Sequence, residues 1–190
     1  MFARFYRRPS AWKSLVAGTA GGLIATVVMT QFQNTWTKAS RALARENGRQ
    51  SDGTQDAEQS NREPKQDQSE DATMKAAGKL ARAAGYELSR ERKKKAGPFV
   101  HYGFGAAMGA LYGLAREFEP RTVKSVHPAL AGSGYGTAMF LGADEIAVPA
   151  LGLSEGDGKA PVSLHLYGLL SHIVYGTTLE FARKTIREIL

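Results

Sequence analysis

The sequence predicts an all-α membrane protein, a four-helix transmembrane bundle built from two hairpin repeats. Four windows of the chain contain no Asp, Glu, Lys or Arg: Ser14 to Thr37, Ala96 to Ala115, Ser125 to Ala143 and Ala160 to Leu179. Each window has about the ~20 residues that a helix needs to cross a hydrocarbon core of ~30 Å. A soluble bundle is the less favoured alternative, because these windows have no charged face to present to water.

Composition narrows the class further. The chain carries a net charge of +7 and has no cysteine, which excludes disulfides, thiolate metal sites and cysteine nucleophiles. The cations gather beside the uncharged windows, where they favour anchoring at lipid headgroups over nucleic-acid binding. We therefore expect the lipid bilayer as the partner, with a homo-oligomer as a further option and no nucleic acid. The clusters are Arg4, Arg7, Arg8 and Lys13; Lys38, Arg41 and Arg45; Arg90, Arg92, Lys93, Lys94 and Lys95; and Arg183, Lys184 and Arg187.

The first half of the chain divides by composition. Residues 1–13 form a basic N-terminal segment, and residues 14–37 form the first transmembrane helix, which is too long for a cleavable signal peptide and lacks an A-x-A site. Residues 38–71 are predicted to be a polar, largely disordered linker, although its first ten residues suit a continuation of the helix. Residues 72–95 have the spacing of an amphipathic helix on the membrane surface, with a solvated helical linker as the alternative.

The second half contains the other three spans. The second transmembrane helix is expected at residues 97–117, starting at Pro98 because proline suits the first turn of a helix. The third is expected at 127–151 and the fourth at 161–181, followed by a basic tail at 182–190.

An internal repeat relates the two hairpins. Helix two aligns with helix four through pairs such as Tyr112 with Tyr175 and Glu117 with Glu180. Helices one and three share glycines at equivalent positions. Two copies of a helical hairpin explain the pattern, with chance similarity between glycine-rich helices as the alternative.

Glycines recur at intervals of one or two turns in every predicted span. In lipid, small residues let helix backbones approach closely, so these positions predict helix-packing faces. They are Gly18, Gly22, Gly105, Gly109, Gly113, Gly132, Gly136, Gly168 and Gly176.

A polar cluster is predicted inside the membrane. Asp144 and Glu145 lie within helix three, where ionised groups are costly unless they are paired or hydrated, and His172 lies at a similar depth on helix four. Topology adds His101 and Gln31 in the same leaflet. A buried clasp that fixes helix register is favoured over a proton or ion pathway and over an interfacial position. Pro149 adds an expected kink with a free carbonyl at Glu145.

Catalytic motifs are absent from the sequence. It contains no H-E-x-x-H, no G-x-S-x-G and no phosphate-binding loop. We therefore predict a non-enzymatic protein with no cofactor and no metal.

Several residues carry a resemblance to a known family. They are Ala147 to Leu153, Ser171 to Tyr175, Glu180 and Arg183, with a glycine-rich first helix and the segment His101 to Gly113. With these residues the chain resembles the YagU-like family of small bacterial inner-membrane proteins. The resemblance implies a multi-pass inner-membrane location and a loose association with acid tolerance. It implies no particular chemistry, because none is established for the family.

Charge beside the spans also predicts orientation. Cations flank the N-terminus, the loop from Arg116 to Lys124 and the C-terminal tail, which favours both termini in the cytoplasm, although Arg90 to Lys95 conflict with that. The leading prediction is a non-enzymatic integral membrane protein of envelope or acid-stress physiology. The alternative is a small proton- or ion-conducting oligomer that uses Asp144, Glu145 and His172.

Overall fold

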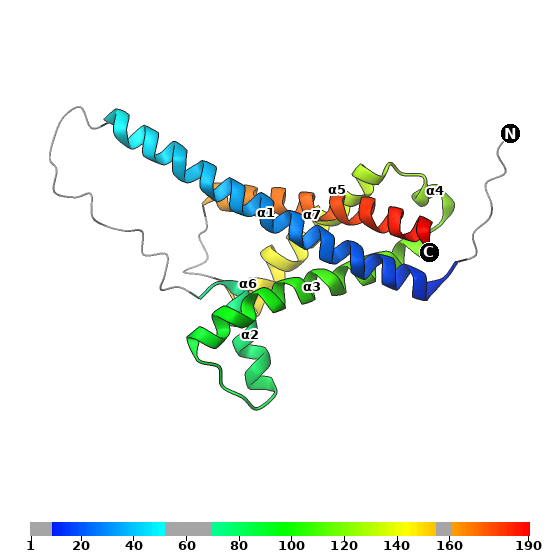
Figure 1. Cartoon of the computed structure of the whole chain (residues 1–190), viewed down its shortest axis with the longest axis horizontal. Coiled ribbons are helices and arrows are strands. Elements are labelled where there is room, and N and C mark those ends of the chain that lie inside the picture. Colours follow the sequence, from blue (N-terminus) through cyan, green and yellow to red (C-terminus); the bar gives the residue numbers. More distant parts are fainter. Residues whose placement is uncertain (1–8, 52–69, 155–160) are drawn as a thin grey trace.

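A computed structural model describes residues 9–51, 70–154 and 161–190, and every regular element among them is helical, which confirms the all-α class. Figure 1 shows long helices running side by side, with a short helix folded against one end. The elements are α1 (Ala11–Ser51), α2 (Ala72–Ala83), α3 (Arg90–Phe118), α4 (Arg121–Lys124), α5 (Pro128–Met139), a π-helical segment η1 (Phe140–Ala147), α6 (Val148–Ala150) and α7 (Val162–Ile189).

Helix α1 is longer than the first predicted span. It begins at Ala11 and continues to Ser51, so the first part of the predicted linker 38–71 is helical. Ala42, Leu43 and Ala44 are strong helix formers, which explains why the helix persists beyond the apolar window. The rest of that linker to residue 69, and residues 1–8 of the basic segment, lie outside the described residues.

The single amphipathic helix predicted at 72–95 is wrong, because the chain turns between α2 and α3. Gly85 adopts a φ of +84°, and Tyr86 N–H bonds to Ala81 O at 2.8 Å while Gly85 N–H bonds to Arg82 O at 3.0 Å. This is a Schellman motif, in which a left-handed glycine ends a helix. A new helix starts after Ser89, so Pro98 lies inside α3 instead of opening it.

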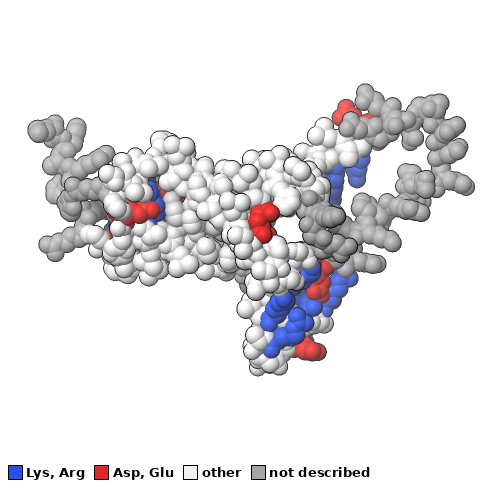
Figure 2. Space-filling view, turned by 180° about the vertical axis from the view of Figure 1, so that it is seen from behind, with Lys and Arg blue, Asp and Glu red and all other residues white. Residues whose placement is uncertain are grey.

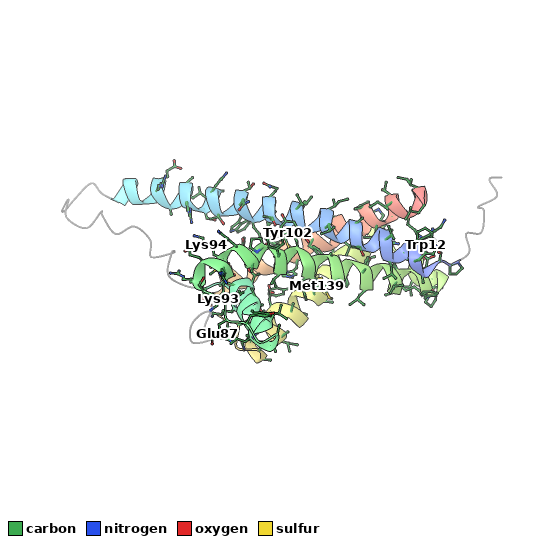
Figure 3. The ribbon with its side chains drawn as sticks, turned by 60° about the horizontal axis from the view of Figure 1, so that its bottom comes forward. Trp12, Glu87, Lys93, Lys94, Tyr102 and Met139 are labelled. Atoms are coloured by element: carbon green, nitrogen blue, oxygen red, sulfur yellow. The ribbon has the colours of Figure 1, made fainter. Side chains whose placement is uncertain are left out.

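Helix α2 packs against the start of α3. Met74, Ala77 and Gly78 are buried, and Lys93 Nζ lies 2.9 Å from Glu70 Oε1. Lys75 and Lys79 donate to the carbonyls of Ser154 and Leu151, which join α2 to the segment after α6. Figure 3 shows Glu87, Lys93 and Lys94 at this end of the molecule, with Trp12 at the opposite end and Met139 between them.

The third predicted span is one helical column with a change of winding. Residues 128–150 remain helical through α5, η1 and α6, and Val148 N–H bonds to Ala143 O, five residues back. A π-helical stretch ends at Ala147, just before Pro149, where the sequence predicts a kink. The fourth predicted span also extends further, since α7 continues to Ile189 and includes residues 182–189 of the expected tail 182–190.

Glycine seams join the helices into two antiparallel hairpins, α1 with α3 and α5 with α7 (Figure 1). A Cβ atom built on Gly109 would lie 2.7 Å from Gly22 Cα, and one on Gly132 would lie 2.5 Å from Gly176 O. Real Cβ contacts are not this short, so the seams admit only glycine without a shift. The structure places the predicted packing glycines in or beside these seams, except Gly168, which meets the Phe140 ring.

The two hairpins repeat the same contacts. Gly18 faces Gly113 in the first hairpin as Gly132 faces Gly176 in the second, and Gly22 faces Gly109 as Gly136 faces His172. These are the pairs that the sequence repeat aligns. Helix α1 also packs on α7, and a core of Ala25, Met29, Tyr112, Met139, Tyr175 and Leu179 fills the centre.

Among the described residues, α1 is the one helix that is long and apolar enough to cross a membrane, over Ala11–Glu46. Helix α5 is only 12 residues long because η1 interrupts the column. Glycine, tyrosine and histidine lower the hydropathy of α3 and α7. One such helix is weak support for a membrane location, because a buried core helix has the same composition.

Candidate functional site

Asp144 and His172 meet across the second hairpin. Asp144 lies on η1 and His172 on α7, with Oδ2 and Nδ1 separated by 3.5 Å. The His172 side chain is 9% exposed and the Asp144 side chain 40% exposed. His172 Nδ1 is also 3.0 Å from the Gly168 carbonyl, which only accepts, so Nδ1 carries the proton in that bond. The contact between η1 and α7 is therefore polar at the level of His172.

His101 extends this cluster to α3. Its Nε2 lies 3.5 Å from the Thr30 hydroxyl on α1, and its ring is close enough to His172 and Asp144 to interact with their charges. Gln31 was predicted to join the cluster, but its side chain is exposed, and the neighbouring Thr30 makes the contact instead. We define the central polar cluster as His101, Asp144 and His172.

Glu145 has a different partner from the one that was predicted. Its Oε1 lies 2.6 Å from His165 Nδ1, and the two side chains are 33% and 45% exposed. Sequence reasoning had considered only His172. The antiparallel register, in which Gly136 faces His172, brings residues near 163–165 opposite Glu145, so the hairpin register was the signal that pointed to His165.

The two adjacent carboxylates lie on a π-helical segment and have separate partners, because neighbouring residues on a helix do not face the same way. Residues 140–147 follow i to i+5 hydrogen bonding, which widens the helix and often occurs at functional sites. Asp144 is directed toward the buried His172 and Glu145 toward the exposed His165. Pro149 follows directly and has no N–H to complete a regular turn. This local winding is not visible as a hydropathy pattern.

A second charged site lies at the opposite end of the bundle. Glu180 is 1% exposed and accepts from Arg183 Nε at 2.7 Å and Arg183 Nη2 at 2.8 Å. It also accepts from Arg116 Nη2 of α3 at 3.1 Å. A buried carboxylate of this kind is tolerated because two guanidinium groups satisfy both of its oxygens. The network joins α3 to α7.

Glu117, the repeat partner of Glu180, forms a parallel network. Its Oε1 lies 2.7 Å from Arg187 Nη2 and accepts the Ser10 N–H at 2.8 Å. Arg187 Nε lies 3.3 Å from the Ser14 hydroxyl of α1. These bonds tie α1, α3 and α7 together at one end. We name the two networks, Glu117 and Glu180 with Arg116, Arg183 and Arg187, the ionic end.

Sequence reasoning missed the ionic end. The repeat aligns Glu117 with Glu180, but the sequence argument places Arg183 and Arg187 at lipid headgroups and Arg116 in a cytoplasmic loop. The Arg116 to Glu180 pair is 64 residues apart in sequence and Arg187 to Glu117 is 70, so only the pairing of the hairpins reveals it. The conspicuous signal was an acidic residue at the same place in both repeats.

The chemistry open to these sites is proton exchange and ion pairing. Histidine changes charge near neutral pH, so the central polar cluster has groups suited to binding and releasing a proton. In the part of the chain that the structure describes, no three His, Asp or Glu side chains converge on one point as metal ligands do.

Comparison with known proteins adds no assignment: no family model, curated protein or solved structure matches the chain. The YagU-like resemblance therefore stays a prediction that rests on the residues quoted for it.

Proposed function

We propose that this chain is a non-enzymatic integral membrane protein whose two hairpins cross the bilayer four times. The observation that carries the proposal is an apolar belt around all four helical columns. Large side chains point outward from each of them, including Leu23 on α1, Phe104 on α3, Leu141 on η1 and Leu166 on α7. In water this much exposed apolar surface on a monomer favours association, whereas in lipid it is solvated.

Charge supports the same placement. Figure 2 shows a middle zone almost free of charged side chains, with charge at the two ends and one small acidic patch between them. Along α1 the distance from Ser14, which contacts the ionic end, to Trp36 is about 33 Å at helical rise. This agrees with a hydrocarbon core of ~30 Å. The glycine seams suit lipid as well, because close backbone packing replaces the hydrophobic effect there.

Orientation follows from the arrangement of the ends. The start of α1, the loop containing α4 and the end of α7 lie together (Figure 1), and Lys13 donates to the Leu190 carbonyl. These are the segments whose cations favour the cytoplasm. Together with the YagU-like resemblance, this supports an inner-membrane protein with both termini inside and a role in envelope or acid-stress physiology.

Single-cysteine labelling tests the four-span topology, because the chain has no cysteine of its own. Ser125→Cys and Ser89→Cys are exposed positions at opposite ends, so a membrane-impermeant maleimide should label Ser89→Cys in spheroplasts and Ser125→Cys only in inverted vesicles. Leu23→Cys and Leu166→Cys should resist labelling until detergent is added. Protection of Leu23→Cys with rapid labelling of Leu166→Cys would indicate a single span.

A second candidate function is proton or ion conduction. The observation that favours it is the central polar cluster, which lies within the belt and contains one half-exposed carboxylate and two histidines. Proton flux into proteoliposomes should fall at least tenfold in Asp144→Asn if the cluster conducts. Flux equal to that of empty liposomes in the intact chain would remove this candidate and leave the structural role of the cluster.

A further inference from the structure

The repeat makes the contact between α1 and α7 equivalent to the contact between α5 and α3. The first pair of helices packs closely, which we call the closed contact, whereas the second pair is held apart. The alignment that relates Gly18 to Gly132 and Gly22 to Gly136 also relates Gly21 to Tyr135. At the closed contact between α1 and α7, a Cβ on Gly21 would lie 3.1 Å from Arg183 N and 3.2 Å from Leu179 Cδ1. Glycine therefore allows these two helices to touch.

Tyr135 separates the other pair, α5 and α3. Its ring centroid lies 4.3 Å from that of Tyr112, and its hydroxyl donates to the Met108 carbonyl at 2.8 Å. A side chain of this size in place of glycine keeps the two backbones apart. The result is a cavity of about 480 Å³ between α3 and α5.

The cavity has an apolar length and a polar end. Met108, Leu111 and Tyr135 line its inner part, and Arg116, Glu119 and Val126 line the part near the ionic end. We name it the α3/α5 groove. Its volume is within the range of ~300–1,000 Å³ that is typical of small-molecule sites.

The polar end contains donor groups that lack an acceptor. Arg116 is 7% exposed, and its Nη1 and Nη2 bind Glu119 and Glu180, but its Nε is buried without a hydrogen-bond partner. The Tyr112 hydroxyl interacts electrostatically with Glu180 but makes no hydrogen bond of normal geometry. Buried donors in this state are costly. Both residues line the groove, but the two donor atoms are shielded from water, so a ligand oxygen reaches Arg116 Nε only when that side chain shifts toward the groove.

We propose that the α3/α5 groove binds one glycerophospholipid. One acyl chain lies along Met108, Leu111 and Tyr135, and an ester or phosphate oxygen accepts from Arg116 Nε. Glu119 and Glu180 already balance the charge of Arg116, so the site selects an oxygen acceptor and has little preference for an anionic headgroup over a zwitterionic one. The inference rests on the proposed membrane location, since the bilayer is the source of the ligand.

Photo-crosslinking tests the site. The full chain is reconstituted in vesicles of phosphatidylethanolamine and phosphatidylglycerol that contain a trace of phosphatidylethanolamine with a diazirine on one acyl chain, and adducts are mapped by mass spectrometry. We expect at least fivefold more adducts at Met108 and Leu111 than at Leu164, which is similarly exposed to Leu111 but lies on α7 away from the groove. A phosphatidylglycerol probe should give the same ratio within a factor of two.

Two variants sharpen the test. Ala115→Trp fills the groove from an exposed position and should lower the adducts at Leu111 at least fivefold, whereas the matched variant Ala138→Trp, exposed on α5 outside the groove, should leave them unchanged. Arg116→Lys keeps the charge that faces Glu180 but removes Nε, and it should lower groove labelling in protein whose thermal unfolding is retained. Thermal unfolding of Ala115→Trp and Ala138→Trp is measured alongside, and the loss of labelling supports the site only where both variants unfold as the intact chain does.

The outcomes separate the groove from the membrane proposal. Adducts around the whole belt with no excess in the groove, or groove labelling unaffected by Ala115→Trp, would overturn the lipid site alone. Crosslinks between two chains through the groove would also overturn it, because a second copy would then be the occupant. Absence of adducts everywhere, with release of the chain by carbonate, would overturn both proposals.

Discussion

The α1/α3 hairpin and the α5/α7 hairpin pack through the same glycine seams, but their first helical columns differ in charge. In the first, α1 is a regular helix of 41 residues whose buried portion carries no ionised group. In the second, the matching column changes to π-helical winding at Phe140 and carries Asp144 and Glu145. The glycine seam packs both hairpins in the same way. The residues at which the hairpins differ, such as Asp144 and Glu145, are therefore not required for this packing.

The carboxylates at the two ends of α7 also differ: Glu180 belongs to this helix, and Glu145 of η1 contacts it through His165. Glu180 is 1% exposed and is held by two arginines, whereas Glu145 is 33% exposed and has one histidine partner. A buried carboxylate with fixed partners acts as a structural tie. A carboxylate with one partly exposed partner, as at Glu145, contributes less to holding the helices together.

The largest effect is expected at Glu180. Glu180→Gln removes the carboxylate that pairs with the buried Arg183 and one of the two that pair with Arg116. Breaking a buried pair of this kind costs about 3–5 kcal/mol of stability. The free energy of unfolding, measured by denaturant titration in mild detergent, should show a loss of that size.

The repeat provides the control for Glu180. Glu117→Gln changes the aligned residue, which is 9% exposed, against 1% for Glu180, and pairs with Arg187, so its loss should be clearly smaller. Equal losses at the two positions would contradict the view that the deeper burial of Glu180 makes it the stronger tie.

The second effect concerns the seams. Gly136→Ala places a Cβ 2.7 Å from the His172 carbonyl carbon, whereas Gly134→Ala, on the same helix, meets nothing within 4 Å. Overpacking of this kind costs about 1–3 kcal/mol. We expect a loss in this range for Gly136→Ala and no loss for Gly134→Ala, by the same unfolding titration. A similar loss for both variants would show that helix propensity, and not the seam, governs stability here.

The glycine seams and helical columns follow from sequence because they are periodic and local. Gly132 and Gly136 are one turn apart, and the uncharged windows end near charged residues. Helix ends were harder to predict, because the Schellman motif at Gly85 and the start after Ser89 depend on backbone conformation. The amphipathic periodicity across 72–95 conceals that break.

The sites were only partly predictable for a related reason. The sequence predicts that Asp144 can meet His172, because this needs only the number of residues between each of them and the loop that joins the third and fourth predicted spans. The pairs of Glu145 with His165 and of Glu180 with Arg116 depend on helix rotation and register, which π-helical winding and the packing of four helices determine. No single segment contains that information.

A smaller effect is expected where the second hairpin departs from the first at Tyr135. Tyr135→Phe keeps the ring that separates α3 from α5 but removes the hydrogen bond to the Met108 carbonyl. The loss of one such bond is worth about 0.5–1.5 kcal/mol. Thermal unfolding should show a decrease of this size, with Tyr86→Phe, an exposed residue outside the bundle, as the unchanged control. No change in Tyr135→Phe would show that the wedge acts through its ring alone.

The smallest effect on stability is expected at Glu145. The Glu145 to His165 pair is short but exposed on both sides, and exposed ion pairs are worth about 0–1 kcal/mol. Glu145→Gln and His165→Gln should therefore each unfold within ~1 kcal/mol of the intact chain, and the double variant should add no further loss. The same unfolding measurement therefore distinguishes the small contribution of Glu145 to stability from the large contribution of Glu180. A loss as large as that of Glu180→Gln would mean that lipid surrounds the pair and makes it a buried tie, and the contrast between the two ends of α7 would then disappear.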